Sequence, residues 1–332
     1  MTIRVGINGM GRIGRDYLRL SLETDDLEVV AVNDVLEPEM LAHLLRYDSS
    51  FGPLAYDVEA DAAGLLVNGR KLAMSSEHDP MQLDWGAAGA DVVIEATGRF
   101  RSRETAGTHL LRGAPRVLLS APGKQVDATI VMGVNDDSYQ PDRHYVISNA
   151  SCTTNCAAPM VKVLHEAFGI ERGFLTTVHA YTNDQNLLDG PHKDPRRARS
   201  AAVNIVPTST GAARAVGGVI PDLAGRLDGI ALRVPVVDGS LVDLAVLLEV
   251  EVTADRVNEA FEVAAETGSL AGRLRYTDLP VVSSDVIGDD SSCLFDSQLT
   301  QAAGRFVKAF GWYDNEWGYT NRLADLTRLV AA

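Results

Sequence analysis

The chain has 332 residues, of which 46% are hydrophobic, and a formal net charge of -15 at pH 7. A chain of this length can bury a full core and is expected to form two domains. The acidic balance argues against nucleic acid or an anionic membrane as the main partner, and no apolar run is long enough to cross a bilayer. Three cysteines and no charged-then-apolar signal pattern at the N-terminus predict a reducing, cytoplasmic location.

A strand, a glycine-rich turn and a helix are predicted at the N-terminus. Ile3 to Asn8 alternate as a strand does, Gly9 to Gly14 read G-x-G-x-x-G, and helical spacing follows. The first glycine permits a tight turn, the second admits a pyrophosphate, and the third allows close helix-strand packing. A second strand, Leu27 to Asn33, leads to Asp34, at the distance where a carboxylate accepts hydrogen bonds from an adenosine ribose. This order favours a dinucleotide site over an ordinary glycine turn.

More α/β units follow without a clear linker or repeat. Asn68-Gly69, between two apolar runs, predicts a hairpin. Asp91 to Ala96 is a candidate buried strand that ends at Thr97, and Arg116 to Ser120 is another. Ligands of an open parallel sheet lie beyond the carboxyl ends of its strands, so Thr97 and Ser120 are candidate cofactor contacts. Each of them alone fits an ordinary strand end about equally well.

The hexapeptide Ser151-Cys152-Thr153-Thr154-Asn155-Cys156 lies between a predicted strand, His144 to Asn149, and a helix-spaced stretch from Met160 to Phe168. Ser151 is a suitable N-cap, which would place the free amides of the first helical turn near the sulfur of Cys152. Helix N-termini favour negative charge and lower a thiol pKa to roughly 3.5 to 7.5. Cys152 is therefore a candidate nucleophile with a lowered pKa.

The alternative for Cys152 is a buried structural thiol, which is the commoner role of a cysteine. Its polar neighbours favour the nucleophile, because a core cysteine has no need of flanking hydroxyl and amide side chains. Cys156, one helical turn further on, and Cys293 are expected to be packing residues.

A candidate base lies near the end of the next predicted strand. Gly173 to Ala180 alternate partly, and His179 is the last polar residue of the run. A single histidine in a strand is more often structural than catalytic. If it met Cys152 across adjacent strands, its imidazole would stabilise the thiolate and pass protons as a general base.

A short basic run, His192 to Arg199, interrupts the acidic sequence. Such a run is usually a solvated face or a nucleic-acid patch, but the net charge disfavours nucleic acid, and phosphate binding fits better. Arginine grips phosphate in a planar, bidentate way, and Ser209 to Gly211 follow with a hydroxyl and backbone amides. Arg233 lies in an apolar strand, where an unpaired charge is costly, so it needs an anionic partner from the protein or the substrate.

The remaining chain predicts strands from Ser240 to Val252 and around Arg305 to Trp312, separated by an amphipathic helix from Ala254 to Thr267. The last predicted helix, after Tyr319, is expected to pack on the first domain. Asn315 has an amide that can pair with another amide, such as a nicotinamide carboxamide, although solvation is the default for a lone asparagine.

Together these motifs resemble those of phosphorylating glyceraldehyde-3-phosphate dehydrogenases, essentially from end to end. The hexapeptide around Cys152 is highly specific for that family. The matching segments are Gly9 to Arg15, Ser151 to Cys156, Thr176 to Thr182, His192 to Arg199, Pro207 to Ala213 and Trp312 to Tyr319.

The resemblance implies an α/β fold with two domains. Residues 1–150 would form a Rossmann dinucleotide-binding domain, completed by a C-terminal helix at 318–332. Residues 151–317 would form an α+β catalytic domain with a mainly antiparallel sheet. The resemblance also implies a homotetramer, in which the loop at residues 181–203 lies at subunit contacts and near the cofactor, NAD.

Site residues follow from the same resemblance. Cys152 resembles the nucleophile and His179 its base. The residues that resemble the NAD contacts are Gly9, Gly11, Arg12, Ile13, Asp34, His78, Thr97, Ser120 and Asn315. Thr182 and Arg233 resemble the pocket for the substrate phosphate. The residues that resemble the inorganic-phosphate pocket are Ser151, Thr153, Arg197, Thr210 and Gly211, and no metal site is implied.

The implied reaction is the oxidation of glyceraldehyde 3-phosphate to 1,3-bisphosphoglycerate. The Cys152 thiolate attacks the aldehyde, and a hydride passes to NAD while His179 takes the hydroxyl proton. Inorganic phosphate then attacks the thioester that remains on Cys152.

Several positions depart from the family pattern. His78 stands where an arginine is common, Ala157 and Gly190 replace common leucines, and Val236 to Gly239 replaces a Thr-Pro-Asn-Val type segment. None of these changes removes a catalytic group. They fit a specialised second copy, for example one less sensitive to an electrophilic inhibitor of the nucleophile.

Two other functions are compatible with these motifs. Erythrose-4-phosphate dehydrogenases share most of these motifs, and a non-catalytic NAD-binding regulator is the alternative outside enzymology. The candidate nucleophile Cys152 disfavours the regulator, because a protein that only binds NAD does not need an activated thiol.

The sequence also predicts which cofactor is preferred. Asp34, with no arginine directly after it, predicts a preference for NAD over NADP that Gly190 relaxes but does not reverse.

Overall fold

The computed structural model describes residues 2–61 and 64–332. The chain divides into two compact units. The first comprises residues 1–130, 137–150 and 320–332, and the second comprises residues 131–136 and 151–319. Within the described residues, no helix is both long enough and apolar enough to cross a membrane.

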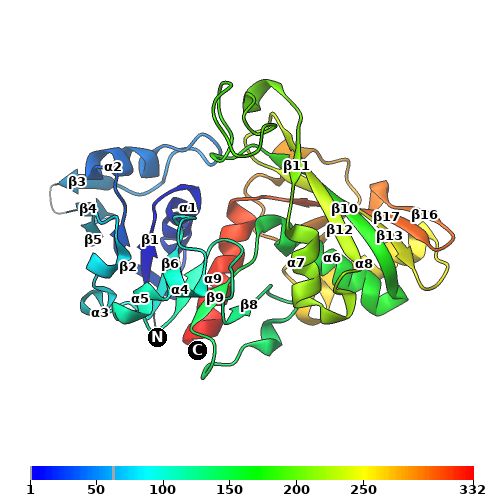
Figure 1. The fold of residues 1–332 in the computed structure, drawn as a ribbon, viewed down its shortest axis with the longest axis horizontal. Coiled ribbons are helices and arrows are strands. Elements are labelled where there is room, and N and C mark those ends of the chain that lie inside the picture. Colours follow the sequence, from blue (N-terminus) through cyan, green and yellow to red (C-terminus); the bar gives the residue numbers. More distant parts are fainter. Residues whose placement is uncertain (1, 62–63) are drawn as a thin grey trace. The chain divides into compact units, whose positions relative to one another are not determined.

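The first unit is built on a nine-stranded sheet with the strand order β3-β4-β5-β2-β1-β6-β7-β9-β8 (Figure 1). The strands from β5 to β8 in that order pair in parallel, while β3, β4 and β5 pair antiparallel. Their bounds are β1 (Ile3–Asn8), β2 (Leu27–Asn33), β3 (Val58–Asp61), β4 (Gly64–Val67), β5 (Arg70–Ser75), β6 (Val92–Glu95), β7 (Val117–Leu119), β8 (Ala128–Thr129) and β9 (Val146–Ser148).

Helices connect these parallel strands, as a parallel sheet requires. They are α1 (Arg12–Ser21), α2 (Pro38–Arg46), α3 (Trp85–Ala88), α4 (Arg103–Ala106) and α5 (Thr108–Leu111). The central strands are apolar and buried on both faces, which is why Val92, Val93 and Ile94 are all fully buried. The predicted hairpin is confirmed, since Asn68 and Gly69 join β4 to β5 with positive φ angles of 50° and 72°.

The last helix, α9 (Trp317–Ala331), belongs to the first unit from residue 320 onward. Tyr17 of α1 donates from its hydroxyl to Thr327 Oγ1 at 3.0 Å. Arg328 pairs with Asp26, with Nε 2.6 Å from Oδ2. The end of the chain therefore packs beside the first helix and the loop before β2.

The second unit is built on an eight-stranded sheet with the order β11-β12-β10-β13-β17-β15-β14, and β16 pairs with β17. Only β10 with β12 and β14 with β15 are parallel. The bounds are β10 (Ile170–Ala180), β11 (Val206–Ser209), β12 (Leu227–Val234), β13 (Ser240–Leu248), β14 (Leu274–Thr277), β15 (Cys293–Asp296), β16 (Gln301–Ala303) and β17 (Phe306–Tyr313).

Three helices complete the second unit: α6 (Cys152–Phe168), α7 (Ala212–Val219) and α8 (Ala254–Glu266). Helix α6 packs on the middle of the sheet against β13, β17 and β15. Strand β10 alternates, so that Leu175, Thr177 and His179 are buried while Phe174 is 71% exposed. This alternation places His179 on the covered side of the sheet.

Short 3-10 helices occur in the loops of both units. They span Pro80–Gln82, Asp136–Ser138, Ala201–Val203, Pro221–Leu223, Gly268–Leu270, Ser283–Val286 and Ser297–Leu299.

Candidate active site

Cys152 is the first residue of α6, as the sequence predicts. Ser151 is the N-cap, and its Oγ accepts the Thr154 backbone N–H at 3.0 Å. Cys152 is partly exposed as a residue, whereas Cys156 and Cys293 are fully buried. The first turn of a 17-residue helix therefore carries a cysteine that is not part of the core.

The structure brings Cys152 and His179 together. Sγ of Cys152 lies 3.4 Å from Nε2 of His179. The two do not meet across adjacent strands, as the sequence suggested. They meet because the buried face of β10 ends opposite the N-terminus of α6, which lies against the same sheet.

The prediction of a lowered pKa for Cys152 is wrong for the chain by itself. Burial raises the pKa of the Cys152 thiol to about 11, against the lowering effects of the Arg233 charge and of the Thr153 backbone and side chain. The helix N-terminus and the cation act in the predicted direction, but loss of water contact outweighs them. The resting pair is therefore a thiol beside an imidazole, and the proton must move during the reaction.

Arg233 packs on the other nitrogen of the imidazole. Its Nη1 lies 2.7 Å from Nδ1 of His179 and donates to the Ala180 carbonyl at 2.8 Å. Nδ1 lies 2.7 Å from the same carbonyl. Burial and the charge of Arg233 lower the pKa of His179 to about 3, so the ring is neutral. Nδ1 can accept from Arg233 or donate to the carbonyl, but not both. In the tautomer with the proton on Nδ1, the ring and Arg233 both donate to the Ala180 carbonyl, and the Nε2 lone pair faces Cys152, as a general base requires.

Tyr313 is a site residue that the sequence interpretation missed. Its hydroxyl is buried between Thr153 Oγ1 at 2.8 Å and Thr177 Oγ1 at 2.9 Å, and its ring lies edge-on to His179 with centroids 5.9 Å apart. Thr153 is only 4% exposed, so its hydroxyl lies in this buried cluster and not in open solvent. An aromatic residue at the end of a strand was the only signal, and it is a weak one.

Positive charge gathers on one side of His179. Arg197 donates from Nε to Thr208 Oγ1 at 2.9 Å and forms an ion pair with Asp184. Its charge contributes, after burial and Arg233, to the lowered pKa of His179. Arg233 is different, because its buried Nε has no hydrogen-bond partner among the described residues. An unpaired guanidinium donor of this kind fits an anionic ligand.

The segment Ser209 to Gly211 leads into α7, and Gly211 is the N-cap of that helix. The N-cap residue itself has no side chain to cap α7, and a Cβ built on Gly211 would meet no atom within 4 Å. Thr210 Oγ1 accepts the Ala212 N–H at 3.2 Å, and Thr182 is half-buried near the end of β10. Open backbone amides at a helix start suit an anion.

Asn315 is also in the second unit and is 5% exposed. Its Oδ1 accepts the Ser240 hydroxyl at 2.5 Å, and Ser240 Oγ in turn accepts the Ala180 N–H at 3.1 Å. The Asn315 amide is therefore fixed with Nδ2 as its remaining donor, next to the residue that follows His179.

In the first unit, the three glycines of the fingerprint have three different surroundings. A Cβ on Gly9 (φ +98°) would lie 2.7 Å from the Thr97 nitrogen, and one on Gly14 would lie 2.1 Å from the Gly9 oxygen. A Cβ on Gly11 would meet nothing within 4 Å. The N-cap residue of helix α1 is Gly11, which makes no side-chain cap hydrogen bond. This open, uncapped turn fits a pyrophosphate.

A pocket of about 240 Å³ adjoins this turn, with Asp34, His78 and Thr97 in its wall. Asp34 Oδ2 accepts the Met10 N–H at 2.6 Å, so the carboxylate lies at the fingerprint turn. The Arg12 side chain pairs with Asp48 in the same unit. Its contribution to a cofactor would therefore come from its backbone.

Comparison with known proteins agrees with this geometry. Residues 3–103 match the model "Glyceraldehyde 3-phosphate dehydrogenase, NAD binding domain", and residues 151–315 match "Glyceraldehyde 3-phosphate dehydrogenase, C-terminal domain". The chain belongs to the glyceraldehyde-3-phosphate dehydrogenase family. A relative with that name from Streptomyces coelicolor is 58% identical over 332 residues, or 99% of each chain. A relative from Geobacillus stearothermophilus is 54% identical, over 100% of this chain and 99% of its own.

Family membership confirms the predicted α/β fold and NAD as the cofactor, and the protein is an NAD-dependent oxidoreductase. The Rossmann-type unit around Gly9 to Gly14 is its NAD-binding domain. Ser120 lies at the end of β7 in this domain, and its N–H donates to the Glu95 carbonyl at 3.1 Å.

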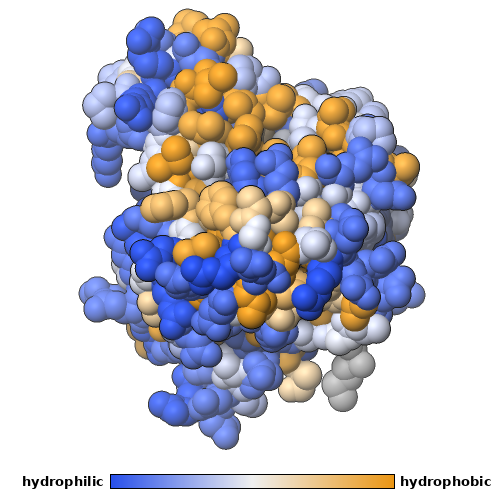
Figure 2. Space-filling model, turned by 90° about the vertical axis from the view of Figure 1, so that its right-hand side faces the viewer, coloured by the Kyte–Doolittle hydropathy of each residue, from blue (hydrophilic) through white to orange (hydrophobic). Residues whose placement is uncertain are grey.

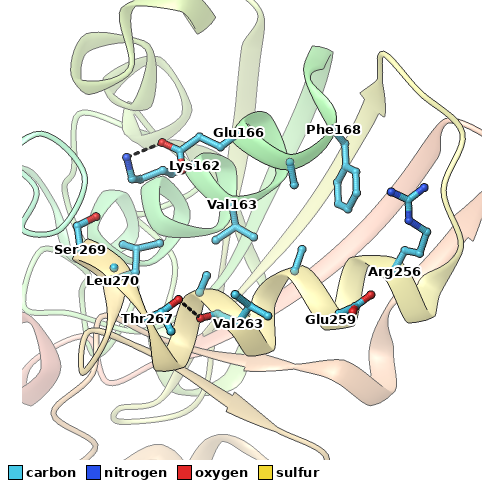
Figure 3. Close-up of a pocket in the computed structure, with 14 residues that line it drawn as sticks. Lys162, Val163, Glu166, Phe168, Arg256, Glu259, Val263, Thr267, Ser269 and Leu270 are labelled. Atoms are coloured by element: carbon cyan, nitrogen blue, oxygen red, sulfur yellow. Dashed lines mark hydrogen bonds and ion pairs between the residues drawn. The ribbon is translucent and has the colours of Figure 1, made fainter.

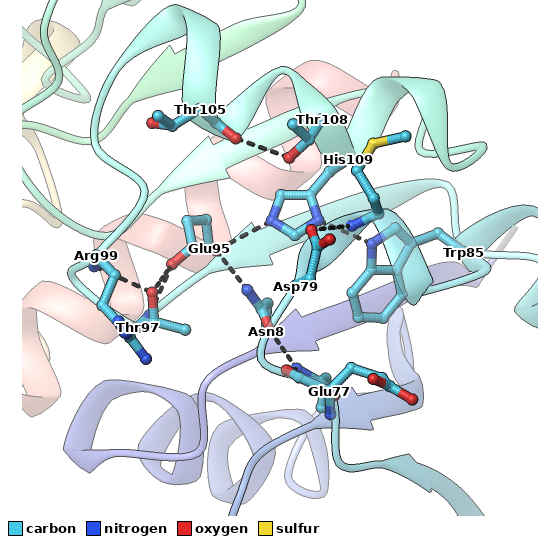
Figure 4. Close-up of polar contacts among 12 residues, drawn as sticks. Asn8, Glu77, Asp79, Trp85, Glu95, Thr97, Arg99, Thr105, Thr108 and His109 are labelled. Atoms are coloured by element: carbon cyan, nitrogen blue, oxygen red, sulfur yellow. Dashed lines mark hydrogen bonds and ion pairs between the residues drawn. The ribbon is translucent and has the colours of Figure 1, made fainter.

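A buried polar network under the NAD-binding pocket also escaped the sequence interpretation (Figure 4). The carboxylate of Glu95, at the end of β6, accepts from Asn8 Nδ2 at 2.6 Å, from the Thr97 N–H at 2.8 Å and from the Thr97 hydroxyl. It also contacts His109 Nε2 at 3.0 Å. Trp85 Nε1 can only donate, and it lies 3.0 Å from His109 Nδ1, so the His109 proton lies on Nε2 and points to Glu95.

Four donors thus surround one carboxylate that is 2% exposed. They link the ends of β1 and β6 to Thr97, whose backbone lies so near Gly9 of the fingerprint that a Cβ there would be 2.7 Å from the Thr97 nitrogen. A glutamate at the end of an otherwise apolar strand was the available signal, since a buried carboxylate needs donors. Its partner His109, and Trp85 which donates to His109, come from helices that no local pattern connects to it.

A larger groove, of about 560 Å³, lies between α6 and α8 (Figure 3). Its charged side chains are engaged, since Lys162 Nζ lies 2.7 Å from Glu166 Oε1 and Arg256 lies over the Phe168 ring at 5.7 Å. None of the candidate site residues lines it. The groove therefore has no convergent polar groups for the chemistry.

Proposed function

We propose that this protein catalyses the phosphorylating oxidation of D-glyceraldehyde 3-phosphate to 1,3-bisphosphoglycerate with NAD. The observation that carries the proposal is the contact between Cys152 and His179, 3.4 Å apart, with Arg233 on the far side of the imidazole. A thiol, a base and an unpaired guanidinium donor are the groups that this reaction needs: a nucleophile, a proton acceptor and a phosphate ligand.

The first step is the addition of the Cys152 sulfur to the aldehyde carbon. His179 Nε2 accepts the thiol proton, and the charge of Arg233 stabilises the anionic sulfur as it forms. The protonated imidazole then gives that proton to the aldehyde oxygen, which becomes the hydroxyl of the hemithioacetal. His179 is neutral again, and its Nε2 is placed to take the hydroxyl proton when the hydride leaves. The Thr153 N–H, at the N-terminus of α6, is a donor near the sulfur for the developing oxyanion.

NAD, when bound, supplies the hydride acceptor. The residues proposed to hold it are Gly9, Gly11, Arg12, Ile13, Asp34, His78, Thr97 and Ser120 of the NAD-binding domain, with Asn315 for the carboxamide. The open Cβ position of Gly11 and the uncapped start of α1 support the pyrophosphate contacts. The fixed Asn315 amide supports the carboxamide contact.

The two phosphate groups have separate pockets in this proposal. Arg233 and Thr182 bind the phosphate of the substrate, and the unpaired Nε of Arg233 supports that role. The inorganic phosphate that attacks the thioester is bound by Ser151, Thr153, Arg197, Thr210 and Gly211. The open N-terminus of α7 at Gly211 supports this second pocket, whereas the Thr153 hydroxyl is already bonded to Tyr313, so Thr153 acts through its backbone.

The protein is proposed to be a cytoplasmic homotetramer. The uncovered side of the second sheet carries Phe174 and Ile230 at 71% and 50% exposure, and the loop at residues 181–203 exposes Leu187 and Leu188 at 76% each. Figure 2 shows, on one face of the molecule, hydrophobic residues gathered between hydrophilic ones. Exposed apolar area of this kind is typical of subunit contacts. Light scattering coupled to size exclusion chromatography measures the mass and tests the assembly.

The activity is tested by mixing the protein with NAD, glyceraldehyde 3-phosphate and phosphate and following NADH absorbance. Arsenate in place of phosphate removes the unfavourable equilibrium as a cause of low signal. Absence of NADH with both anions would refute the proposal and leave an NAD-binding regulator. A higher kcat/KM for erythrose 4-phosphate than for glyceraldehyde 3-phosphate would instead assign the chain to that related activity.

A further inference from the structure

Two carboxyl groups lie together in the second unit without a cation. Asp238, in the loop between β12 and β13, and Asp314, after β17, are each 1% exposed, and their side chains are hydrogen-bond neighbours. Neither forms an ion pair with a described residue. Two ionised carboxylates that adjoin in a buried site would repel each other strongly, so the pair must hold a proton.

The hydrogen bonds decide which carboxyl carries the proton. Asp314 accepts three backbone N–H groups, from Gly288 at 2.7 Å, Glu316 at 2.8 Å and Trp317 at 2.7 Å. The last two belong to the start of α9, where negative charge is favoured. Asp238 accepts only the N–H of Gly239, at 2.8 Å, and its buried Oδ2 has no donor among the described residues. Asp314 is the acceptor of the pair, and Asp238 must donate.

We propose that Asp238 is a neutral carboxylic acid that donates its proton to Asp314 and thereby positions the turn that carries Asn315. Asn315 directly follows Asp314 and is fixed on its other side by Ser240. Asp238 is thus a positioning residue for the nicotinamide contact, and this part rests on the proposed function. It lies in the segment Val236 to Gly239, where the sequence departs from the family pattern.

The charged and titratable groups that face Asp238 make it hard to ionise. Burial and the charges of Asp314 and Glu316 raise the pKa of Asp238 to about 9. Burial also raises the pKa of Asp314. Cys152, at the start of α6, is near enough for the Asp238 charge to raise its pKa as well. Ionisation of Asp238 would therefore oppose formation of the Cys152 thiolate.

The direct test is infrared difference spectroscopy of the full-length protein titrated with base. The wild type should show the band of a buried protonated carboxyl that disappears as the pH rises through about 9. Asp238→Asn keeps a donor to Asp314 but has no such proton, so the band should be absent. Asp228→Asn is the matched control, because Asp228 also accepts the N–H of the glycine that follows it, at 2.9 Å, but is exposed. An unchanged band in Asp238→Asn, or no band in the wild type, overturns the proposal.

Stability gives an independent readout that does not depend on the enzyme's substrate. The folded protein holds the Asp238 proton between the ordinary carboxyl pKa of 3.8 and about 9, and unfolding releases it. Rising pH in this window should raise the unfolding equilibrium constant of the wild type about tenfold per pH unit relative to Asp238→Asn. Equal pH slopes for the two proteins contradict the proposal. A different outcome is that the pH slopes of the two proteins differ while their KM for NAD rises equally above pH 9. That result would keep the protonated Asp238 and overturn its role in positioning Asn315.

Discussion

Nη1 of Arg233 lies 2.7 Å from Nδ1 of His179, and both approach the carbonyl oxygen of Ala180. In the tautomer with the proton on Nδ1, both groups donate to this carbonyl, which fixes the imidazole beside the guanidinium, while the Arg233 Nε has no hydrogen-bond partner among the described residues. One residue thus orients the base and offers a donor to an anion. Its charge also lowers the pKa of His179 and opposes the effect of burial on the pKa of Cys152.

Arg233→Lys is expected to reduce kcat/KM far more for glyceraldehyde 3-phosphate than for unphosphorylated glyceraldehyde. Lysine keeps the charge near His179 but cannot form the planar, bidentate contact with a phosphate group. Steady-state kinetics with both aldehydes measure the difference. Equal losses would mean that Arg233 acts only by orienting His179.

Cys152→Ser is expected to abolish turnover almost completely while NAD binding, measured by calorimetry, is retained. A serine hydroxyl is a much weaker acid than the Cys152 thiol, so His179 cannot readily remove its proton, and it is the poorer nucleophile. His179→Asn should reduce kcat/KM by about 10² to 10⁴, the usual value for a general base. The same variant should slow alkylation of Cys152 by iodoacetamide, because no acceptor remains for the thiol proton. Substantial dehydrogenase activity in Cys152→Ser would remove Cys152 from the mechanism.

Local features of the site followed directly from the sequence. The Ser151 cap and the positions of Gly9, Gly11 and Gly14 depend on residues close together in the chain, and the structure has each where its pattern places it. The pKa of Cys152 did not follow. A helix N-terminus can be recognised from a few residues, but burial depends on everything that packs around the thiol, and burial is the larger effect.

Hydrogen bonds between residues far apart in the chain could also not be predicted from the sequence. The sequence around Glu95 does not indicate that His109 bonds to its carboxylate or that Trp85 bonds to His109, and the sequence around Asp238 does not indicate Asp314. In each case the visible signal was a carboxyl group in an apolar or buried setting, which requires a partner without naming it. Such residues can be flagged from sequence as needing a partner, but only the fold identifies it.

His179 should make the protein more sensitive to acid. Its pKa is about 3 in the folded chain, against an ordinary value of 6.5, because it is buried beside Arg233. The unfolded state therefore binds more protons between these values, and stability is lost as the pH falls from 6.5 toward 3. His179→Asn should lose less stability than the wild type over this range, measured by circular dichroism. His43→Asn, at an exposed histidine of α2, is the control. If it reduced the loss of stability at low pH as much as His179→Asn does, the effect would not be specific to His179.

Glu95→Gln should weaken NAD binding about tenfold, with a smaller effect on kcat at saturating NAD. In either orientation the glutamine NH2 group faces a donor: Asn8 Nδ2 and His109 Nε2 at the Oε2 position, or the Thr97 N–H at the Oε1 position. A buried mismatch of this kind costs about 1–3 kcal/mol. The affected contact is Thr97 against Gly9. Glu104→Gln, at an exposed position of α4, removes the same charge without these bonds. A lower melting temperature with unchanged NAD affinity would make the network purely structural.

The last prediction concerns the choice between NAD and NADP. Asp34 is held at the fingerprint turn by the Met10 N–H, 2.6 Å from Oδ2, so its charge faces the expected position of the ribose. Repulsion of a 2′-phosphate should cost roughly 1 kcal/mol or more, about fivefold in affinity, even in a water-like medium. The wild type should have a clearly higher kcat/KM with NAD than with NADP. Asp34→Asn, which retains an oxygen to accept the Met10 N–H, should lower the ratio of the two kcat/KM values. Gly190→Leu restores the side-chain bulk common in the family and should raise this ratio. A wild type that uses both cofactors equally would show that the loop around Gly190, and not Asp34, sets the choice.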